Sequence, residues 1–230
     1  MKWEDWRASY EHILSDFSYD PGNEQKAREA GNRASASNPA IMKGEEALGV
    51  LRKTLARKCL VTGNAPSLAV DMDRLRAAGE VAGRAIVASD SSCRTLHGLG
   101  IVPDIIVTDL DGDVETEKGM NGAGSLAVVH FHGDNIARAT EFTGSLRGRA
   151  IVTTQAGPTD CTFNFGGFTD GDRAVLLCEE FGAADVILAG FDFERIAEKG
   201  TEGDIKRRKL ARAKSIVEDA SLRGLKITYA

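Results

Sequence analysis

Short apolar runs alternate with helical patterns along most of this chain from residue 59 onward. A short apolar run bounded by turn residues is typical of a strand buried on both faces of a parallel sheet. The runs predict strands at residues 59–62, 85–90, 104–107, 126–131, 150–154, 186–189 and 226–229. Their alternation with helices indicates an α/β fold, an open and mainly parallel sheet covered by helices on both sides.

The first 57 residues have a different pattern, which is helical throughout. Residues 23–58 are rich in Ala, Glu, Lys and Arg and predict helix with a break near Ser37-Asn38-Pro39. We expect an N-terminal helical cap over residues 1–57 and an α/β domain over residues 58–230; the cap could fold over the sheet or mediate self-association. An amphipathic helix that stops before residue 20 is predicted by the spacing of Trp3, Trp6, Tyr10, Ile13, Leu14 and Phe17.

Composition excludes several classes of function. The net charge of −5 gives no general attraction to nucleic acid or to an anionic membrane. The sequence has no apolar run near the roughly 20 residues of a membrane span and no signal-peptide pattern, so we expect a cytoplasmic protein. Its four cysteines are scattered, which favours buried thiols over a zinc site or a disulfide framework.

Acidic residues gather where the strand before residue 109 runs into a turn. Asp109 and Asp111 are two positions apart and would converge in an extended chain, and Gly112 would turn Asp113 back toward them. Asp90 ends the preceding predicted strand and is expected to share the same crevice. Carboxylates at this spacing suit Mg²⁺, and the predicted metal ligands are Asp90, Asp109 and Asp111. The alternative is a solvated acidic turn whose aspartates cap helices.

Other predicted strands also end in polar residues. The strand at 126–131 is followed by His132-Gly133-Asp134-Asn135, the next one by Gln155, and the strand at 186–189 by Asp192. We expect these endings to meet at one edge of the sheet. His132 could touch phosphate or metal there, whereas His130 is expected to be buried and hydrogen bonded.

Two glycine-containing segments add candidate anion sites. Gly63, Asn64 and Ser67 lie where a strand enters a helix, which exposes backbone N–H groups to an anion, although the segment lacks the Lys of a Walker loop. Residues 163–173 combine aromatic rings, glycines and the pair Asp172-Arg173, which could face phosphates. Either Asp170 or Asp172 is expected to cap the helix that follows.

These motifs together resemble the archaeal 6-hydroxymethyl-7,8-dihydropterin pyrophosphokinases, and the acidic stretch is also similar to that of thiamine pyrophosphokinases. The resemblance covers nearly the whole chain and implies a Rossmann-like, thiamine pyrophosphokinase-like fold. It implies Mg²⁺-dependent transfer of the β,γ-diphosphate of ATP to the hydroxymethyl group of a reduced pterin, with release of AMP, in folate- or methanopterin-type biosynthesis. The segments that carry it are residues 3–20, 89–90, 99–111, 132–135, 164–173 and 189–193.

Given this reaction, the chemistry of the side chains predicts roles for individual residues in the α/β catalytic domain. The catalytic group would be Asp109, Asp111, Asp134 and Arg173. ATP would contact Gly63, Asn64, Ser67, Asp90, Ser91, His132 and Asp172. The pterin would contact Gln155, Phe163, Asn164, Phe165 and Asp192.

Two other functions remain open at this point. A transferase that uses nucleotide sugars would need a similar glycine loop and similar acids at strand ends. A nucleotide-binding module without catalysis would use the same acids to hold a metal. A thiamine pyrophosphokinase would share the chemistry but prefer another acceptor.

Overall fold

The fold is built around one parallel β-sheet, and the computed structural model describes residues 2–195 and 200–230. Within these residues the sheet has seven strands, all paired in parallel. The strands are β1 (Cys59–Thr62), β2 (Ala85–Ser89), β3 (Ile105–Thr108), β4 (Leu126–Phe131), β5 (Ala150–Thr154), β6 (Val186–Ala189) and β7 (Ile227–Tyr229). The helices are α1 (Trp3–Phe17), α2 (Pro21–Ser37), α3 (Gly44–Leu55), α4 (Leu68–Ala77), α5 (Ser92–Gly98), α6 (Val114–Gly122), α7 (Ile136–Ser145), α8 (Asp170–Glu180) and α9 (Gly200–Leu222).

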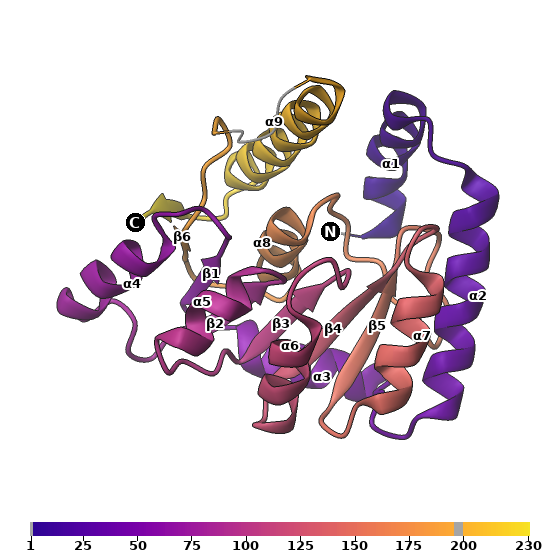
Figure 1. The fold of residues 1–230 in the computed structure, drawn as a ribbon, viewed down its shortest axis with the longest axis horizontal. Coiled ribbons are helices and arrows are strands. Elements are labelled where there is room, and N and C mark those ends of the chain that lie inside the picture. Colours follow the sequence, from indigo (N-terminus) through magenta and orange to yellow (C-terminus); the bar gives the residue numbers. More distant parts are fainter. Residues whose placement is uncertain (1, 196–199) are drawn as a thin grey trace.

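The strand order is β5-β4-β3-β2-β1-β6-β7 (Figure 1). The chain therefore builds the sheet outward from β1 to β5 and then returns to add β6 on the other side of β1. In open parallel sheets, ligands bind beyond the carboxyl ends of the strands where the winding direction changes. That point lies between β1 and β6 in this sheet.

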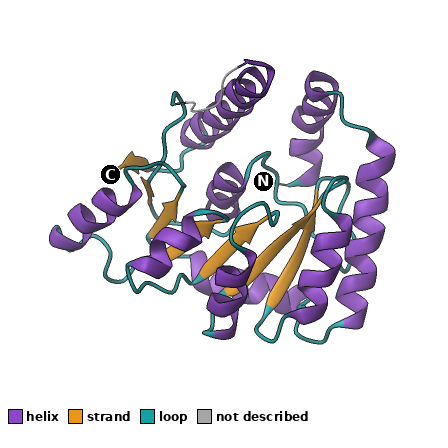
Figure 2. Cartoon of the chain, viewed as in Figure 1, coloured by secondary structure: helices purple, strands orange, loops and turns teal. Residues whose placement is uncertain are grey.

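Helices cover both faces of the sheet, as the sequence predicts (Figure 2). Because side chains alternate along a strand, Val61 and Val87 point to one face and Leu60 and Ile86 to the other. The first face packs against α1, α3, α8 and α9. The second face packs against α4, α5 and α6 at its centre and against α2 and α7 near β5.

The sequence predicts the strands closely. The expected bounds of β1, β4, β5 and β6 match the structure, those of β2 and β7 differ by one residue at one end, and β3 is shifted by one residue at both ends. The expected helix break near Ser37-Asn38-Pro39 separates α2 from α3, and Asn38 stabilises it by donating a side-chain hydrogen bond to the Thr143 carbonyl at 2.7 Å. After the break, Ile41 pairs with Ala150 at the open side of β5. No helix within the described residues has the length and apolar character needed to cross a bilayer.

The N-terminal helices share their core with the sheet. Trp6 and Ile13 of α1 and Leu51 of α3 belong to the same buried cluster as Val61 and Val87. On the opposite face, α2 packs alongside α7 and places Ala27 and Ala30 against the end of the sheet (Figure 1). The boundary expected at residues 57 and 58 falls in the connection between α3 and β1, but helices on the N-terminal side of it cover both faces of the sheet.

A chain that begins at residue 58 is therefore expected not to fold stably. Removing α1–α3 would expose the side chains of the sheet that pack against Leu51 and Leu55 on one face and against Ala27 on the other. The burial of each large aliphatic side chain contributes about 1.5–3 kcal/mol to the free energy of folding. Urea unfolding followed by circular dichroism, with the full chain as reference, checks this. A truncated chain that remains monomeric and unfolds cooperatively would contradict it.

Candidate active site

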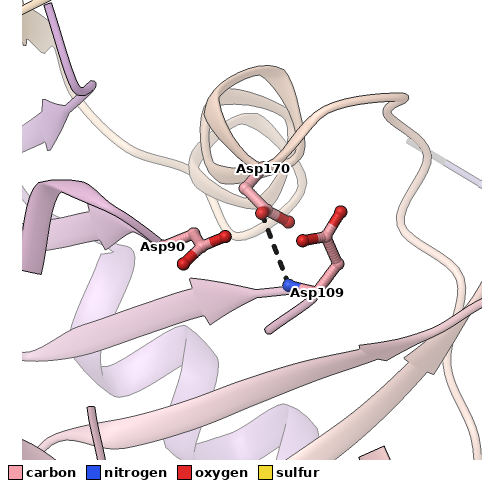
Figure 3. Close-up of side chains that lie close together, drawn as sticks. All are labelled: Asp90, Asp109 and Asp170. Atoms are coloured by element: carbon pink, nitrogen blue, oxygen red, sulfur yellow. Dashed lines mark hydrogen bonds between the residues drawn. The ribbon is translucent and has the colours of Figure 1, made fainter. Parts of the chain in front are cut away.

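Three carboxylates converge at the carboxyl edge of the sheet. Asp90 follows β2, Asp109 follows β3, and Asp170 is the first residue of α8. Each offers an oxygen atom, and these oxygens all lie within 4.8 Å of one another. Figure 3 shows the three side chains pointing toward a common centre, with the Asp109 backbone N–H donating to Asp170 Oδ2 at 3.4 Å. We call Asp90, Asp109 and Asp170 the carboxylate cluster.

The backbone of Asp90 is strained. Its φ is +27°, in the left-handed region that residues with a side chain rarely adopt. Its backbone N–H donates to the Val107 carbonyl at 2.8 Å, which extends the pairing of β2 with β3 into the turn. Gly112 leaves room for the carboxylate, because a Cβ there would lie 1.9 Å from Asp90 Oδ1.

Asp109 is fixed by contacts on both sides of the chain. Asn135 donates one side-chain hydrogen bond to the Asp109 carbonyl and another to the His130 carbonyl, each at 2.8 Å, and so ties the end of β3 to the end of β4. Leu110 then adopts a φ of +70° and buries its side chain in the core beside α7. The amide of Leu110 donates to Thr108 Oγ1 at 2.9 Å.

The turn at Leu110 separates Asp109 from the acids that follow it. Asp111 is largely exposed and pairs with Arg138 at 2.9 Å. Asp113 caps α6 by accepting from the Thr116 amide and pairs with Arg94. Asp111 and Asp113 are therefore not part of the carboxylate cluster, because the two-residue alternation of the strand ends at Thr108, although Asp111 lines the same cavity as Asp109.

Asp170 takes the place in the cluster that the sequence assigned to Asp111. Its Oδ1 accepts from Arg173 Nη1 at 2.9 Å, and the same nitrogen lies 3.8 Å from Asp109 Oδ2. The helix cap is supplied by Thr169 and Asp172, whose side chains form a capping box. The Thr-x-x-Asp spacing in the sequence could have identified Thr169 and Asp172 as the cap, which leaves Asp170 available for the cluster.

The cluster concentrates negative charge in a buried place. Burial raises the pKa of Asp90 to about 9, and the neighbouring carboxyls of Glu117, Asp109 and Asp111 add to the shift. Burial and Asp109 likewise raise the pKa of Asp170, which Arg173 partly offsets. Asp90 Oδ1 is buried and has no hydrogen-bond partner within the described part of the chain. An orphaned carboxylate oxygen among further carboxylates fits a hard divalent cation such as Mg²⁺.

Glu117 of α6 lies behind the cluster and was not found from the sequence. It is fully buried, and burial raises its pKa to about 7. Neither of its carboxylate oxygens has a hydrogen-bond partner among the described residues. It is the fourth residue of α6, whose first turn is acidic, and no motif distinguishes it from its neighbours Glu115 and Thr116.

A larger cavity of about 410 Å³ lies on one side of the cluster, at the change of winding between β1 and β6. Gly63 and Gly190 approach each other there, and a Cβ on Gly63 would lie 2.6 Å from the Gly190 carbonyl oxygen. Ser89, which precedes Asp90, and Gly171, which follows Asp170, also line it. We call this space the switch-point cavity. Its other lining residues are Asn64, Ala65, Pro66, Thr169, Phe191, Asp192, Phe193, Arg195, Lys206, Leu210 and Ala213.

A smaller cavity of about 160 Å³ lies on the other side of the cluster, between the ends of β3–β5 and the first two helices. Asp109 and Arg173 connect it to the cluster. We call it the helix-side cavity. Its other lining residues are Tyr10, Ile13, Tyr19, Glu24, Asp111, His132, Asp134, Arg138, Gln155, Phe168 and Lys209. The structure thus gathers the expected residues Asp111, His132, Asp134 and Gln155 around one space.

The histidines have different surroundings. His130 is buried and its Nδ1 is 3.0 Å from Thr153 Oγ1, as expected from the sequence. His132 lines the helix-side cavity, its Nδ1 accepts from the Asp134 amide, and its Nε2 is buried without a partner in the described residues. Burial and the charge of Arg173 lower the pKa of His132, which favours the neutral imidazole.

Two of the expected nucleotide contacts, Ser67 and Asp172, form hydrogen bonds within the fold, whereas Ser91 does not cap its helix. Ser67 donates its hydroxyl to Asp71 Oδ2 at 2.8 Å and does not line the switch-point cavity. Both oxygens of Asp172 accept hydrogen bonds from the Phe168 and Thr169 region, and the residue is 1% exposed, so it does not face a nucleotide. Ser91 is the N-cap position of α5 without a side-chain cap bond.

The expected pterin contacts at residues 163–165 lie away from the two cavities beside the cluster, although Asn164 and Phe165 line a third, small cavity with Arg173. Phe163 stacks on Phe165 with ring centroids 5.5 Å apart, and Phe165 packs edge-on against Phe181. Asn164 donates to the Gln155 and Ala156 carbonyls, both at 3.0 Å. None of the three lines either of the two cavities beside the cluster, because the strand-like pairing of Phe163 with Thr153 turns the segment into the core.

Sequence reasoning missed the contribution of the N-terminal helices to the site. Tyr10 of α1, Tyr19 of the α1–α2 connection and Glu24 of α2 line the helix-side cavity, together with Lys209 of α9. Tyr10 belongs to the aromatic stripe of the first helix, which indicated packing. Glu24 lies in a charged helical segment, and nothing in its neighbours sets it apart.

Comparison with known proteins agrees with the resemblance seen in the motifs. The family described as 6-hydroxymethylpterin diphosphokinase MptE-like matches residues 35–197. Proteins named 6-hydroxymethyl-7,8-dihydropterin pyrophosphokinase are 35% identical in Pyrococcus furiosus (86% of this chain, 81% of the relative) and 34% identical in Methanothermobacter thermautotrophicus (95% and 94%). One from Methanocaldococcus jannaschii is 31% identical (94% and 95%).

Among solved structures, the Maf glycosyltransferase of Magnetospirillum magneticum aligns with a TM-score of 0.47 and 15% identity. The alignment covers 84% of this chain and 35% of that one. The matched segment of the family contains all three residues of the carboxylate cluster, and three relatives align over most of this chain. The chain belongs to the MptE-like family of 6-hydroxymethylpterin diphosphokinases.

Proposed function

We propose that this protein transfers the diphosphate group of ATP to the hydroxymethyl oxygen of 6-hydroxymethyl-7,8-dihydropterin in a Mg²⁺-dependent reaction. The new bond joins that oxygen to the β-phosphorus, the bond between the β-phosphorus and the oxygen of AMP breaks, and AMP leaves. The observation that carries the proposal is the position of the carboxylate cluster between two cavities. The names of the three archaeal relatives support the choice of substrate.

The switch-point cavity is the proposed site for ATP. It is the larger of the two and lies where open parallel sheets bind nucleotides. Because Gly63 and Gly190 have no side chains where they approach each other, their backbone groups can lie close to the phosphates of ATP. Arg195 and Lys206 supply positive charge on its wall.

Mg²⁺ would be held by Asp90, Asp109 and Asp170, whose oxygens suit its preference for carboxylate ligands. When bound, the ion would neutralise charge on the phosphates of ATP. The observation in favour is the unpartnered, buried Oδ1 of Asp90 among further acids. Asp111 and Asp134 line the neighbouring cavity and would contact the complex from outside the cluster.

Arg173 and His132 are the proposed partners of the reacting groups. Arg173 is buried beside Asp109 and Asp170, and its Nε has no partner among the described residues, so it can donate to an oxygen of the transferred diphosphate. Because Nδ1 of the neutral His132 accepts from the Asp134 amide, Nε2 carries the ring proton; this N–H has no hydrogen-bond partner among the described residues and could donate to an oxygen of the substrates.

A direct assay tests the reaction. Purified protein is incubated with ATP, MgCl₂ and the dihydropterin, and AMP and pterin diphosphate are followed by HPLC. We expect the two products in equal amounts, no turnover after treatment with EDTA, and recovery when Mg²⁺ is restored. Thiamine is the control acceptor and should not compete with the pterin. A folded protein that binds ATP but forms neither product would contradict the proposal.

A further inference from the structure

We propose that the helix-side cavity receives the pterin ring and that Glu24 accepts hydrogen bonds from its 2-amino group and the adjacent ring N–H. This inference rests on the proposed function and adds the residue that selects the acceptor. It assigns the pterin to the side of the cluster formed by α1 and α2, rather than to Asp192, which lines the switch-point cavity.

Glu24 is held as an acceptor with one oxygen unused. Its Oε1 accepts from the Gly133 amide at 3.2 Å, while Oε2 is buried and has no hydrogen-bond partner within the described residues. The residue is 7% exposed and lines the helix-side cavity. Gly133 permits this approach of α2 to the sheet, because a Cβ there would lie 2.9 Å from the Cβ of Asn23.

A structural role does not account for this carboxylate. Within the described chain, no cation forms a salt bridge with Glu24, and an unpaired buried acid destabilises a fold unless something satisfies it. Burial raises the pKa of Glu24, and the Gly133 amide and the charge of Arg173 act in the opposite direction. The Glu24 carboxylate therefore lines the cavity with one oxygen available to accept a hydrogen bond from a ligand.

The edge of a pterin supplies donors in the required arrangement. Its 2-amino group and neighbouring ring N–H point the same way and can donate to the two oxygens of a carboxylate. Adenine offers an acceptor nitrogen beside its amino group, and so does the aminopyrimidine of thiamine. Glu24 would thus favour the pterin over the base of the co-substrate and over the acceptor of a related reaction.

The remaining walls suit a flat ring near the reacting centre. Tyr10, Tyr19 and Phe168 supply aromatic surface, and Phe168 packs 6.4 Å from the ring of Tyr19. Asp109 and Arg173 line the same cavity, so a hydroxymethyl group on the bound ring would lie next to the carboxylate cluster. ATP in the switch-point cavity would approach the cluster from the opposite side, where Ser89 and Gly171 lie.

Glu24→Gln tests the inference with little change of shape. We expect the KM for the pterin to rise roughly 10- to 100-fold, because the charged acceptor becomes an amide that presents donors to donors. The KM for ATP should stay within about twofold, as expected for a side chain remote from the nucleotide cavity. Glu29→Gln is the matched control, since Glu29 is an exposed glutamate on the same helix and should behave as wild type. Asp192→Ala should raise the KM for ATP and leave that for the pterin.

A second measurement compares two acceptors, and its first part needs only the wild-type protein. Wild-type protein should use an acceptor that lacks the 2-amino group at least tenfold less efficiently, and Glu24→Gln should lose that preference. An unchanged pterin KM in folded Glu24→Gln, or equal use of both acceptors by wild type, would overturn the inference.

Pterin binding, measured by isothermal calorimetry without ATP, separates this inference from the proposed reaction. Binding that is weakened by Glu24→Gln and not by Glu29→Gln supports the role of Glu24 even if wild type forms no diphosphate product. If wild type turns over and Glu24→Gln binds the pterin as tightly as Glu29→Gln, the role of Glu24 is contradicted but the proposed reaction is not.

Discussion

Asp109→Asn is expected to lower kcat for diphosphate transfer by about a thousandfold, the scale of losing one preorganised electrostatic contact in a water-excluded site. Asparagine keeps the size of the side chain but removes a charge from the centre of the carboxylate cluster. That charge raises the pKa of both Asp90 and Asp170, so its loss relieves repulsion in the folded protein. The melting temperature should therefore stay the same or rise while activity falls.

Steady-state kinetics with a thermal melt of each variant check this, and Mn²⁺ binding followed by electron paramagnetic resonance reports on the metal without turnover. Asp111→Asn is the matched comparison. Asp111 lies two residues away, is largely exposed and pairs with Arg138, so we expect at most about a tenfold effect from a surface ion pair at the rim of the site. A larger loss in Asp111→Asn than in Asp109→Asn would restore the ligand set expected from strand alternation.

Gly112→Ala is expected to reduce kcat at least about a hundredfold. Gly112 has no side chain that could contact substrate, so the effect would come from displacement of Asp90. The added Cβ would lie 1.9 Å from Asp90 Oδ1 and 3.0 Å from the Ser91 amide, so the carboxylate would have to leave the cluster. Asp90 already has an unfavourable φ and little freedom to adjust. Overpacking of this kind costs about 1–3 kcal/mol, and urea unfolding should show a loss in that range.

Gly119→Ala controls for the substitution itself. Gly119 lies in α6, and a Cβ there would meet nothing within 4 Å. Alanine in a helix interior is favoured over glycine by about 0.8–1.0 kcal/mol, so this variant should be slightly more stable and fully active. Wild-type activity in Gly112→Ala would show that Asp90 does not act from its observed position.

The sequence predicts most of the fold because its strands are continuous apolar runs. Residues 126–131 and 150–154 are examples in which every side chain of the strand is buried, so the pattern has clear limits. The edge where the strands end was also predictable, since parallel strands place all their carboxyl ends together. Both conclusions depend on short-range patterns and on general topology.

Which residues form the site could not be predicted exactly, because it depends on contacts between segments that are distant in the sequence. Leu110 takes a left-handed conformation and buries its side chain in the core beside α7, and the strand alternation therefore does not continue to Asp111. Asp170 reaches the cluster because α8 packs across the sheet from a distant part of the chain. Polar loop residues such as Ser67 and Asn164 resembled ligands in the sequence but satisfy neighbouring groups of the chain instead.

The helix-side cavity is built from two stretches of chain that are far apart in the sequence. The segment matched by the family, residues 35–197, contains the carboxylate cluster, whereas Tyr10, Tyr19 and Glu24 precede it. Mutations in α1 and α2 could therefore alter which molecule is accepted and leave the transfer chemistry in place. Such a division would let a duplicated gene acquire a new acceptor by drift in its first two dozen codons, and it makes those helices the natural target for redirecting the enzyme by selection in the laboratory.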